Sequence, residues 1–196
     1  ERVVLDISLD GAVPVDSDQN GARDGMPDLD AVFEIGPSLK ITLLDIEPYE
    51  LRINLPYRYV YSSDFNRLDS RGTLFHPNLS FDYRRHWNIG LSLGPLYGSQ
   101  EYHNYYYSVA PEFVTATRPA YQADGGYSGM RYTLGLSRRY NGFWLGAFIR
   151  YDDLNNAAFS DSPLLTQNHA LMAGVSLAWF FQHSAKRVLV EEETAY

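Results

Sequence analysis

The segment that most constrains the fold of this chain is residues 168–181, where apolar residues alternate with small or polar ones. Its apolar face carries Leu171, Ala173, Val175, Leu177, Trp179 and Phe181. A period of two over this length indicates a β-strand with one apolar face. Strands of globular proteins average about 5–6 residues, whereas a strand that crosses a bilayer at a tilt needs about 9–11. The length and the terminal aromatic residues therefore predict the closing strand of a transmembrane β-barrel.

Composition narrows the class of protein without contradicting this prediction. The chain has 196 residues, which suits one domain, and it has no cysteine, which excludes disulfides and thiolate metal sites. Its net charge of −8 argues against nucleic acid as a partner. No run reaches the ~18 apolar residues of a transmembrane helix. Strands that alternate lipid-facing and lumen-facing residues keep the mean hydropathy low, here −0.31.

The same alternation recurs in seven further segments. They are residues 2–13, 29–43, 49–62, 74–84, 87–97, 127–138 and 143–151. In the clearest of them, residues 49–62, aliphatic residues fill the middle of the apolar face and tyrosines occupy its ends. Aromatic residues make up 15% of the chain, which fits girdles at two membrane interfaces.

The connections between these segments alternate in length. Short turns are predicted at residues 44–48, 85–86 and 139–142, and long loops at residues 14–28, 63–73, 98–126 and 152–167. Bacterial outer-membrane barrels have even strand counts, short periplasmic turns and long extracellular loops. We therefore predict an all-β, antiparallel, up-and-down transmembrane β-barrel over residues 1–181 and a charged tail over residues 182–196. A soluble lipocalin-like barrel is the alternative.

Several charged residues fall on the faces opposite the apolar ones. They are Asp30, Glu34, Lys40, Arg52, Arg58, Asp82, Arg84, Arg131 and Arg150. A face that mixes both signs of charge indicates a polar lumen, which either conducts or is filled by paired charges. With only eight strands we expect a filled lumen, whereas twelve strands would leave room for a narrow pore.

An ordered set of motifs resembles the MipA/OmpV family of outer-membrane proteins. The motifs are residues 25–30 and 34–39, residues 106–112 followed by 118–121 and 125–126, and residues 148–154 and 160–165. The resemblance implies an outer-membrane barrel of about twelve strands, of which this chain holds the C-terminal eight. Because the chain begins at Glu1 without a visible signal peptide, we interpret it as processed or truncated.

The resemblance also implies partners rather than an activity. One member of the family bridges a periplasmic murein lytic transglycosylase and a bifunctional penicillin-binding synthase, and no catalytic residue is transferred with it. We therefore expect a non-enzymatic envelope scaffold embedded in outer-membrane lipid. A porin-like, small-molecule-binding or adhesin barrel is the alternative, and Tyr102 and residues 105–107 would then form a contact patch or an upper aromatic girdle.

Two constellations suggest chemistry. Asp16, Asp18, Asn20 and Asp24 space oxygen ligands as in a short calcium loop, although Pro27 stands where an EF-hand needs glutamate. The alternative is a solvated acidic loop, because Asp, Asn and Gly favour turns. His76 and Ser80 share a strand face with Asn78 and Asp82, but residues four apart on a strand lie about 13 Å apart, too far for a nucleophile and its base.

Overall fold

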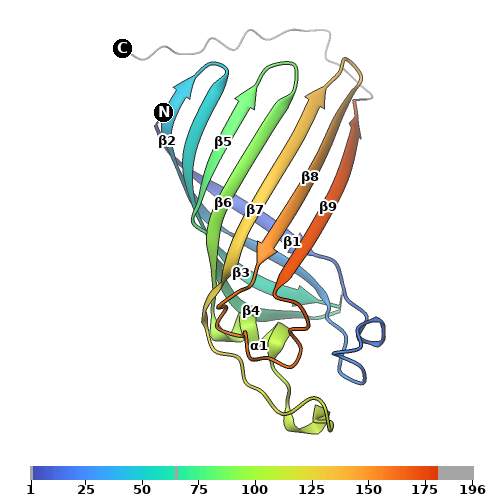
Figure 1. The fold of residues 1–196 in the computed structure, drawn as a ribbon. Coiled ribbons are helices and arrows are strands. Elements are labelled where there is room, and N and C mark those ends of the chain that lie inside the picture. The colour runs from blue at the N-terminus through green and yellow to red at the C-terminus, as the bar shows by residue number, and fades with distance from the viewer. Residues whose placement is uncertain (1, 65, 181–196) are drawn as a thin grey trace.

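The computed structural model describes residues 2–64 and 66–180, and one antiparallel sheet dominates it (Figure 1). The strands are β1 (Val3–Ala12), β2 (Ala31–Ile46), β3 (Tyr49–Ser63), β4 (Leu68–Phe75), β5 (Asn78–Arg84), β6 (Asn88–Gly98), β7 (Gly126–Arg139), β8 (Phe143–Asp153) and β9 (His169–Trp179). One α-helix, α1 (Gln100–Tyr107), and two 3₁₀ turns, η1 (Ser17–Gln19) and η2 (Pro111–Phe113), lie in the connections. None of the helices in this part of the chain is long and apolar enough to cross a membrane.

The strand order confirms the predicted all-β, up-and-down arrangement. The order is β1-β2-β3-β4-β6-β7-β8-β9, each strand is antiparallel to its neighbours, and β5 continues the column of β4 between β3 and β6. The sheet curls strongly, with β1 behind β9 in the view of Figure 1. Within the described residues no ladder joins β1 to β9, so these two strands are the edges of the sheet.

The predicted fourth strand, residues 74–84, is split and extended. The register against β3 continues unbroken from Tyr57↔Phe75 to Asn54↔Asn78, but the ladder is interrupted between them. Pro56 and Pro77 lack an N–H, so the only bond across this gap runs from His76 N–H to the Pro56 carbonyl at 3.2 Å. The prediction of a loop at residues 63–73 was wrong, because β4 already begins at Leu68.

The end of β2 also departs from the prediction. A bulge between Thr42 and Leu44 inserts one extra residue, after which Leu44 faces Leu51 and Ile46 faces Tyr49. The apolar face therefore continues through Leu44 and Ile46 rather than ending at Leu43. The connection to β3 is shorter than the predicted residues 44–48.

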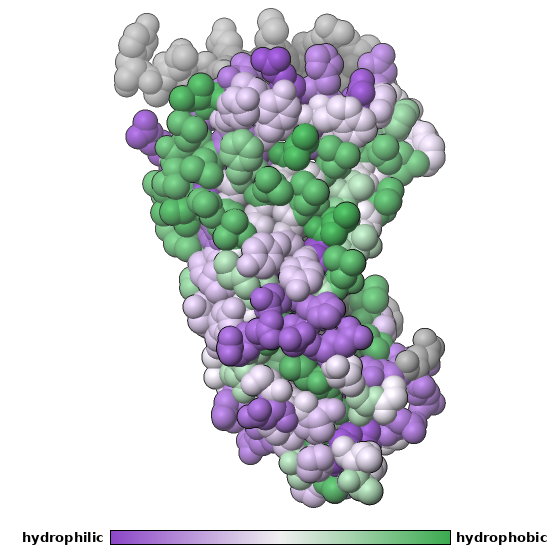
Figure 2. All heavy atoms as spheres, viewed as in Figure 1, coloured by the Kyte–Doolittle hydropathy of each residue, from purple (hydrophilic) through white to green (hydrophobic). Residues whose placement is uncertain are grey.

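The two faces of the sheet differ as the alternation predicted. Leu91, Leu134 and Ile149 are among many exposed apolar residues of the outer face. Figure 2 shows a hydrophobic belt across the strands on the side in view. The inner face is polar along most of its length. Only near the loop end does it carry a buried apolar cluster, formed by Val32, Val60, Leu74 and Leu96. Phe181 and the predicted tail lie outside the described residues.

Gly94 in β6 lies close to the backbone of Pro77 and Asn78, in the gap between β4 and β5. A Cβ at this position would lie 2.1 Å from the Pro77 carbonyl oxygen and 2.7 Å from the Asn78 Cα. We expect Gly94→Ala to lower the free energy of unfolding by about 1–3 kcal/mol, because the clashing atoms are backbone atoms and the Asn78 Cβ, which cannot move without the backbone.

Gly142→Ala is the matched control, since a Cβ there meets no atom within 4 Å. It should change the free energy of unfolding by less than about 0.5 kcal/mol. Urea unfolding in detergent micelles, followed by tryptophan fluorescence, measures both. Equal midpoints for the two variants would contradict the close approach.

Candidate functional site

Three connections gather at one end of the sheet, opposite the short turns (Figure 1). They are residues 13–30, 99–125 and 154–168, and we refer to them together as the cap. The cap contains the helical elements, both isolated bridges (Val15↔Leu29 and Val109↔Tyr121) and most of the buried polar groups outside the strands. Polar groups that are buried and hydrogen-bonded at a strand end make this the best-built candidate site.

Helix α1 closes the inner face at the cap end. The Ser99 hydroxyl accepts hydrogen bonds from the backbone N–H of Tyr102 at 3.3 Å and from that of Thr73 in β4 at 3.1 Å. The first bond caps the helix and the second ties it to the sheet. Tyr102, Tyr105 and Tyr106 then pack against the inner apolar cluster. The connection at residues 98–126 was predicted as an external loop, but its helix packs on the inner face.

His103 is the fully buried centre of the cap. Its Nδ1 donates to the Asp124 carbonyl at 2.5 Å, and its Nε2 lies 2.7 Å from the Ser128 Oγ at the start of β7. Because a carbonyl can only accept, the neutral ring carries its proton on Nδ1 and accepts the Ser128 proton on Nε2. Burial lowers the pKa of His103 below its usual range. Sequence reasoning placed this histidine in a loop and missed its role, because both partners are distant in the chain.

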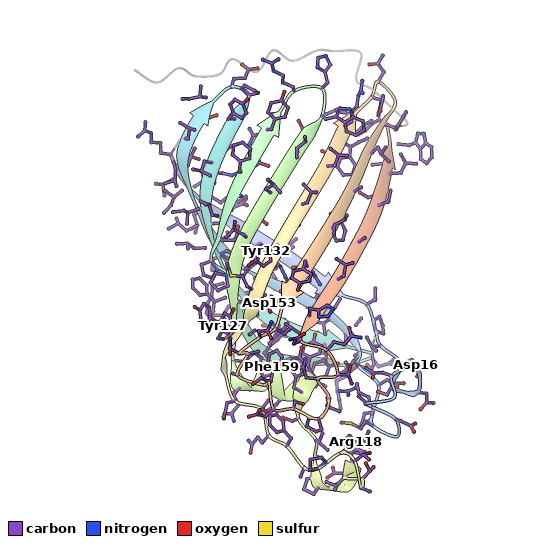
Figure 3. All side chains as sticks on the ribbon, in the orientation of Figure 1. Asp16, Arg118, Tyr127, Tyr132, Asp153 and Phe159 are labelled. Atoms are coloured by element: carbon purple, nitrogen blue, oxygen red, sulfur yellow. The ribbon has the colours of Figure 1, made fainter. Side chains whose placement is uncertain are left out.

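The third connection is attached through aromatic contacts. Phe159 is buried and stacks on Tyr107 with ring centroids 3.6 Å apart, and it meets the His103 ring edge-on at 4.8 Å. The Ser162 hydroxyl donates to the Tyr107 carbonyl at 2.6 Å. Burial raises the pKa of Tyr107 to about 12, so its hydroxyl stays protonated. Figure 3 labels Phe159, which lies in the cap beside α1.

Two buried arginines attach the first connection. Arg23 donates to the carbonyls of Pro27 at 3.1 Å and Tyr106 at 3.2 Å. Arg118 donates to the carbonyls of Ala22 at 3.0 Å and Asp24 at 2.9 Å. Each guanidinium therefore bridges segments that are far apart in sequence, which makes the cap one body rather than three loose loops.

Below the cap the inner face carries paired charges, as the alternation predicted. Arg131 forms a bidentate pair with Asp152 at 2.8 and 2.9 Å, and Arg150 approaches the same carboxylate at 3.5 Å. Arg58 lies 2.8 Å from the Glu34 carboxylate and 3.6 Å from that of Asp10.

The pairing continues toward the turns. Arg52 bridges Glu50 at 3.0 Å and Asp82 at 2.7 Å, and Arg84 also pairs with Glu50. Lys40 pairs with Asp6 of β1 at 2.5 Å. Asp30 differs from the rest, because it precedes β2 and its backbone N–H donates to the Tyr105 hydroxyl in the cap at 2.8 Å.

A cavity of about 200 Å³ lies between the cap and the charged layer. Tyr102, Tyr106, Tyr107 and Phe159 form its aromatic wall, and its polar wall includes Ser128, Arg131, Arg150 and Asp152. Aromatic surface beside guanidinium groups can hold a small polar or anionic molecule.

Two of the predicted calcium-loop residues, Asp16 and Asn20, use their side chains in local hydrogen bonds. The Asp16 carboxylate accepts from the Asp18 N–H at 3.0 Å at the start of η1, and the Asn20 side chain accepts from the Ala22 N–H at 3.2 Å. Asp24 contributes its backbone carbonyl to Arg118. Residues 2–64 and 66–180 contain no group of three or more His, Asp or Glu side chains arranged to hold a metal ion. Calcium binding stays a prediction.

The polar residues of β5 form structural contacts. Asn54 donates to Asn78 at 2.9 Å and to Ser80 at 3.0 Å, and Asp82 pairs with Arg52. Among residues 2–64 and 66–180, a hydroxyl group hydrogen-bonded to a histidine ring is found instead at Ser128 and His103. His103 is fully buried, so a substrate could reach this pair only after the cap opened.

Comparison with known proteins gives a family but no individual relative. The family model of the MltA-interacting protein MipA matches residues 1–181. Neither the curated proteins nor the solved structures include a match.

The burial of a neutral His103 predicts a pH-dependent cap. Because the folded-state pKa lies below the unfolded value of about 6.5, the unfolded segment binds more protons as the pH falls below that value. Cap stability should therefore be complete above about pH 6.5 and decrease below it, with opening rising by up to about tenfold per pH unit. Hydrogen exchange of residues 99–125, corrected for intrinsic rates, measures this opening.

His103→Gln should remove the pH dependence, since glutamine does not titrate in this range. His169→Gln, at an exposed position at the start of β9, is the control and should retain it. The prediction is wrong if the corrected hydrogen-exchange rates of wild type and His103→Gln depend equally on pH between pH 7.5 and 5.5.

Calorimetric titration tests the calcium loop. A calcium site requires heat of binding from the wild type at up to millimolar calcium and none from Asp16→Asn/Asp18→Asn, because the double variant lacks two carboxylates. No heat from the wild type would end the prediction.

Proposed function

Because the chain belongs to the MltA-interacting protein MipA family, we propose that it is a β-barrel protein of the outer membrane that acts without catalysis. Its partner in this proposal is a periplasmic murein lytic transglycosylase, and the description of the family as MltA-interacting supports this choice. The observation that carries the membrane part is the apolar belt on the outer face. Membership of the MipA family is the observation that supports the transglycosylase as the partner.

The belt has the composition and layering expected against lipid. Leu91, Leu93, Leu134 and Ile149 are each between 43% and 51% exposed, although they lie in the middle of paired strands. A soluble protein rarely exposes so large a contiguous apolar surface. Against hydrocarbon the same side chains are stabilised.

Aromatic residues border the belt at both ends. Toward the cap they include Tyr57, Tyr59, Tyr97 and Tyr132, and toward the turns they include Tyr49, Tyr83, Trp87 and Trp179. Figure 2 shows the pale aromatic rings above and below the hydrophobic belt, and a strongly polar region beyond the lower ones. Such girdles are typical of the two membrane interfaces.

The lengths of the connections support one orientation. The β2–β3, β5–β6 and β7–β8 turns are short, whereas the cap gathers the long connections. Short turns face the periplasm in outer-membrane barrels. The turn end is therefore the surface that we propose contacts the transglycosylase, and a bifunctional penicillin-binding synthase that shares the complex.

The cavity beneath the cap supports a second candidate function, the binding of a small molecule. Its tyrosine and arginine walls offer both apolar surface and hydrogen-bond donors. A conducting pore is less well supported, because the charges of the inner face are paired and α1 packs on that face. Single-channel conductance in planar bilayers would separate binding from conduction.

The absence of cysteine from the chain allows a direct test of orientation and partner. Asn141→Cys lies in the β7–β8 turn and Asn66→Cys between β3 and β4 at the opposite end. A maleimide too large for porins should label Asn66→Cys in intact cells and Asn141→Cys only after the outer membrane is permeabilised. Labelling of both sites in intact cells would contradict the orientation.

The same two variants, carrying a benzophenone on the cysteine, test the partner. Illumination with purified murein lytic transglycosylase should cross-link it to residue 141 and not to residue 66, because only the turn end faces the periplasm. A parallel reaction contains the penicillin-binding synthase as well. Absence of a cross-link at residue 141, or equal yields at both sites, would overturn the proposed interaction surface.

A further inference from the structure

Among the strands that the structure describes, the outer face of the sheet carries a single cationic side chain. The lysines and arginines that belong to the polar inner face of the described strands and pair there with carboxylates are Lys40, Arg52, Arg58, Arg71, Arg84, Arg131 and Arg150. Alternation places Arg139 on the same face, where it contacts the Phe180 ring. Arg138 instead shares the outer face with Leu134 and Leu136. It lies at the turn end of β7, one residue before that strand ends.

Aromatic rings rather than carboxylates surround Arg138. Its guanidinium carbon lies 5.3 Å from the Trp87 ring centroid and 4.9 Å from that of Tyr140. No carboxylate among the described residues pairs with it. Rings hold a guanidinium in place without neutralising its charge, so Arg138 remains available to an anion.

A hollow of about 490 Å³ lies beside this arginine on the outer surface. Tyr83, Arg85, His86, Trp87, Ile89 and Leu136 line it. Ile89 and Leu136 are cross-strand partners and form its apolar part. Arg85 and His86, in the β5–β6 turn, are exposed at its polar end. The hollow is thus apolar toward the middle of the strands and cationic toward their ends.

We infer that this hollow binds an anionic glycerophospholipid, with its phosphate on Arg138 and Arg85 and an acyl chain along Ile89 and Leu136. The inference rests on the proposed membrane function, because it needs the turn end to lie at a lipid headgroup layer. A lipid with net negative charge fits better than a zwitterionic one, since the ammonium of the latter would meet the same guanidinium groups. The site lies on the leaflet that faces the short turns.

Trp87 provides a reporter at the site. In a Trp144→Phe/Trp179→Phe background it is the only tryptophan of the chain. The full chain is reconstituted into phosphatidylcholine nanodiscs that contain a small, equal fraction of either dibrominated phosphatidylglycerol or dibrominated phosphatidylcholine. Bromine quenches tryptophan only at short range, so quenching reports the lipid that occupies the hollow.

We expect the brominated phosphatidylglycerol to be enriched at Trp87 by about fivefold over the phosphatidylcholine. Arg138→Gln should abolish the excess. Arg67→Gln, which removes an exposed charge paired with Asp69 near the cap, should retain it. This pattern at low and moderate salt would support the site.

The other outcomes are distinguishable. Equal quenching by the two lipids, or an excess that survives Arg138→Gln, overturns the lipid site and leaves the membrane proposal intact. No quenching by either lipid overturns the membrane proposal together with the site, because Trp87 would then not contact lipid.

Discussion

The separation of the sheet into an apolar outer face and a charged inner face is the constraint on which the rest of the structure depends. Every inner-face charge must find a partner within the curled sheet, and pairs such as Arg131–Asp152 and Arg58–Glu34 connect neighbouring strands. Arg58 of β3 also pairs with Asp10 and donates to the Ser8 hydroxyl, both in β1. These contacts attach the edge strand β1 to β3 across β2. A shift of one residue in any register would exchange these charges with the outer leucines.

In the cap too, buried polar groups need partners, but here the groups are backbone carbonyls rather than charged side chains. The long connections of the cap would leave backbone carbonyls unpaired where they pack together, and Arg23, Arg118 and His103 donate to those carbonyls. Aromatic stacking of Phe159 on Tyr107 then fills the space that remains. The cap thereby positions Tyr102, Tyr106 and Tyr107 of α1 over the charged layer of the inner face. The cavity is the space between these tyrosines and the charged layer.

Alternation predicted the sheet and its faces well, because period two depends only on local sequence. The errors arose where a non-local contact decided the outcome. The bulge at Thr42 and the start of β4 at Leu68 depend on pairing with β3, which the polar composition of residues 63–73 obscured. His103 gave no local signal, since Asp124 and Ser128 reach it only after the connection folds back. Helix α1 had one readable signal, Ser99 as an N-cap.

Within the described residues, β1 and β9 are the edges of the sheet, and their relative direction limits how many strands could join them. Successive strands along the order are antiparallel, so β1 and β9 run in opposite directions. Two opposed edges can be joined directly or through an even number of additional strands, never through an odd number, if all neighbours remain antiparallel. In hydrocarbon an open edge would leave a row of amides without partners. Any strands inserted between these two edges would therefore have to come in pairs, as hairpins do.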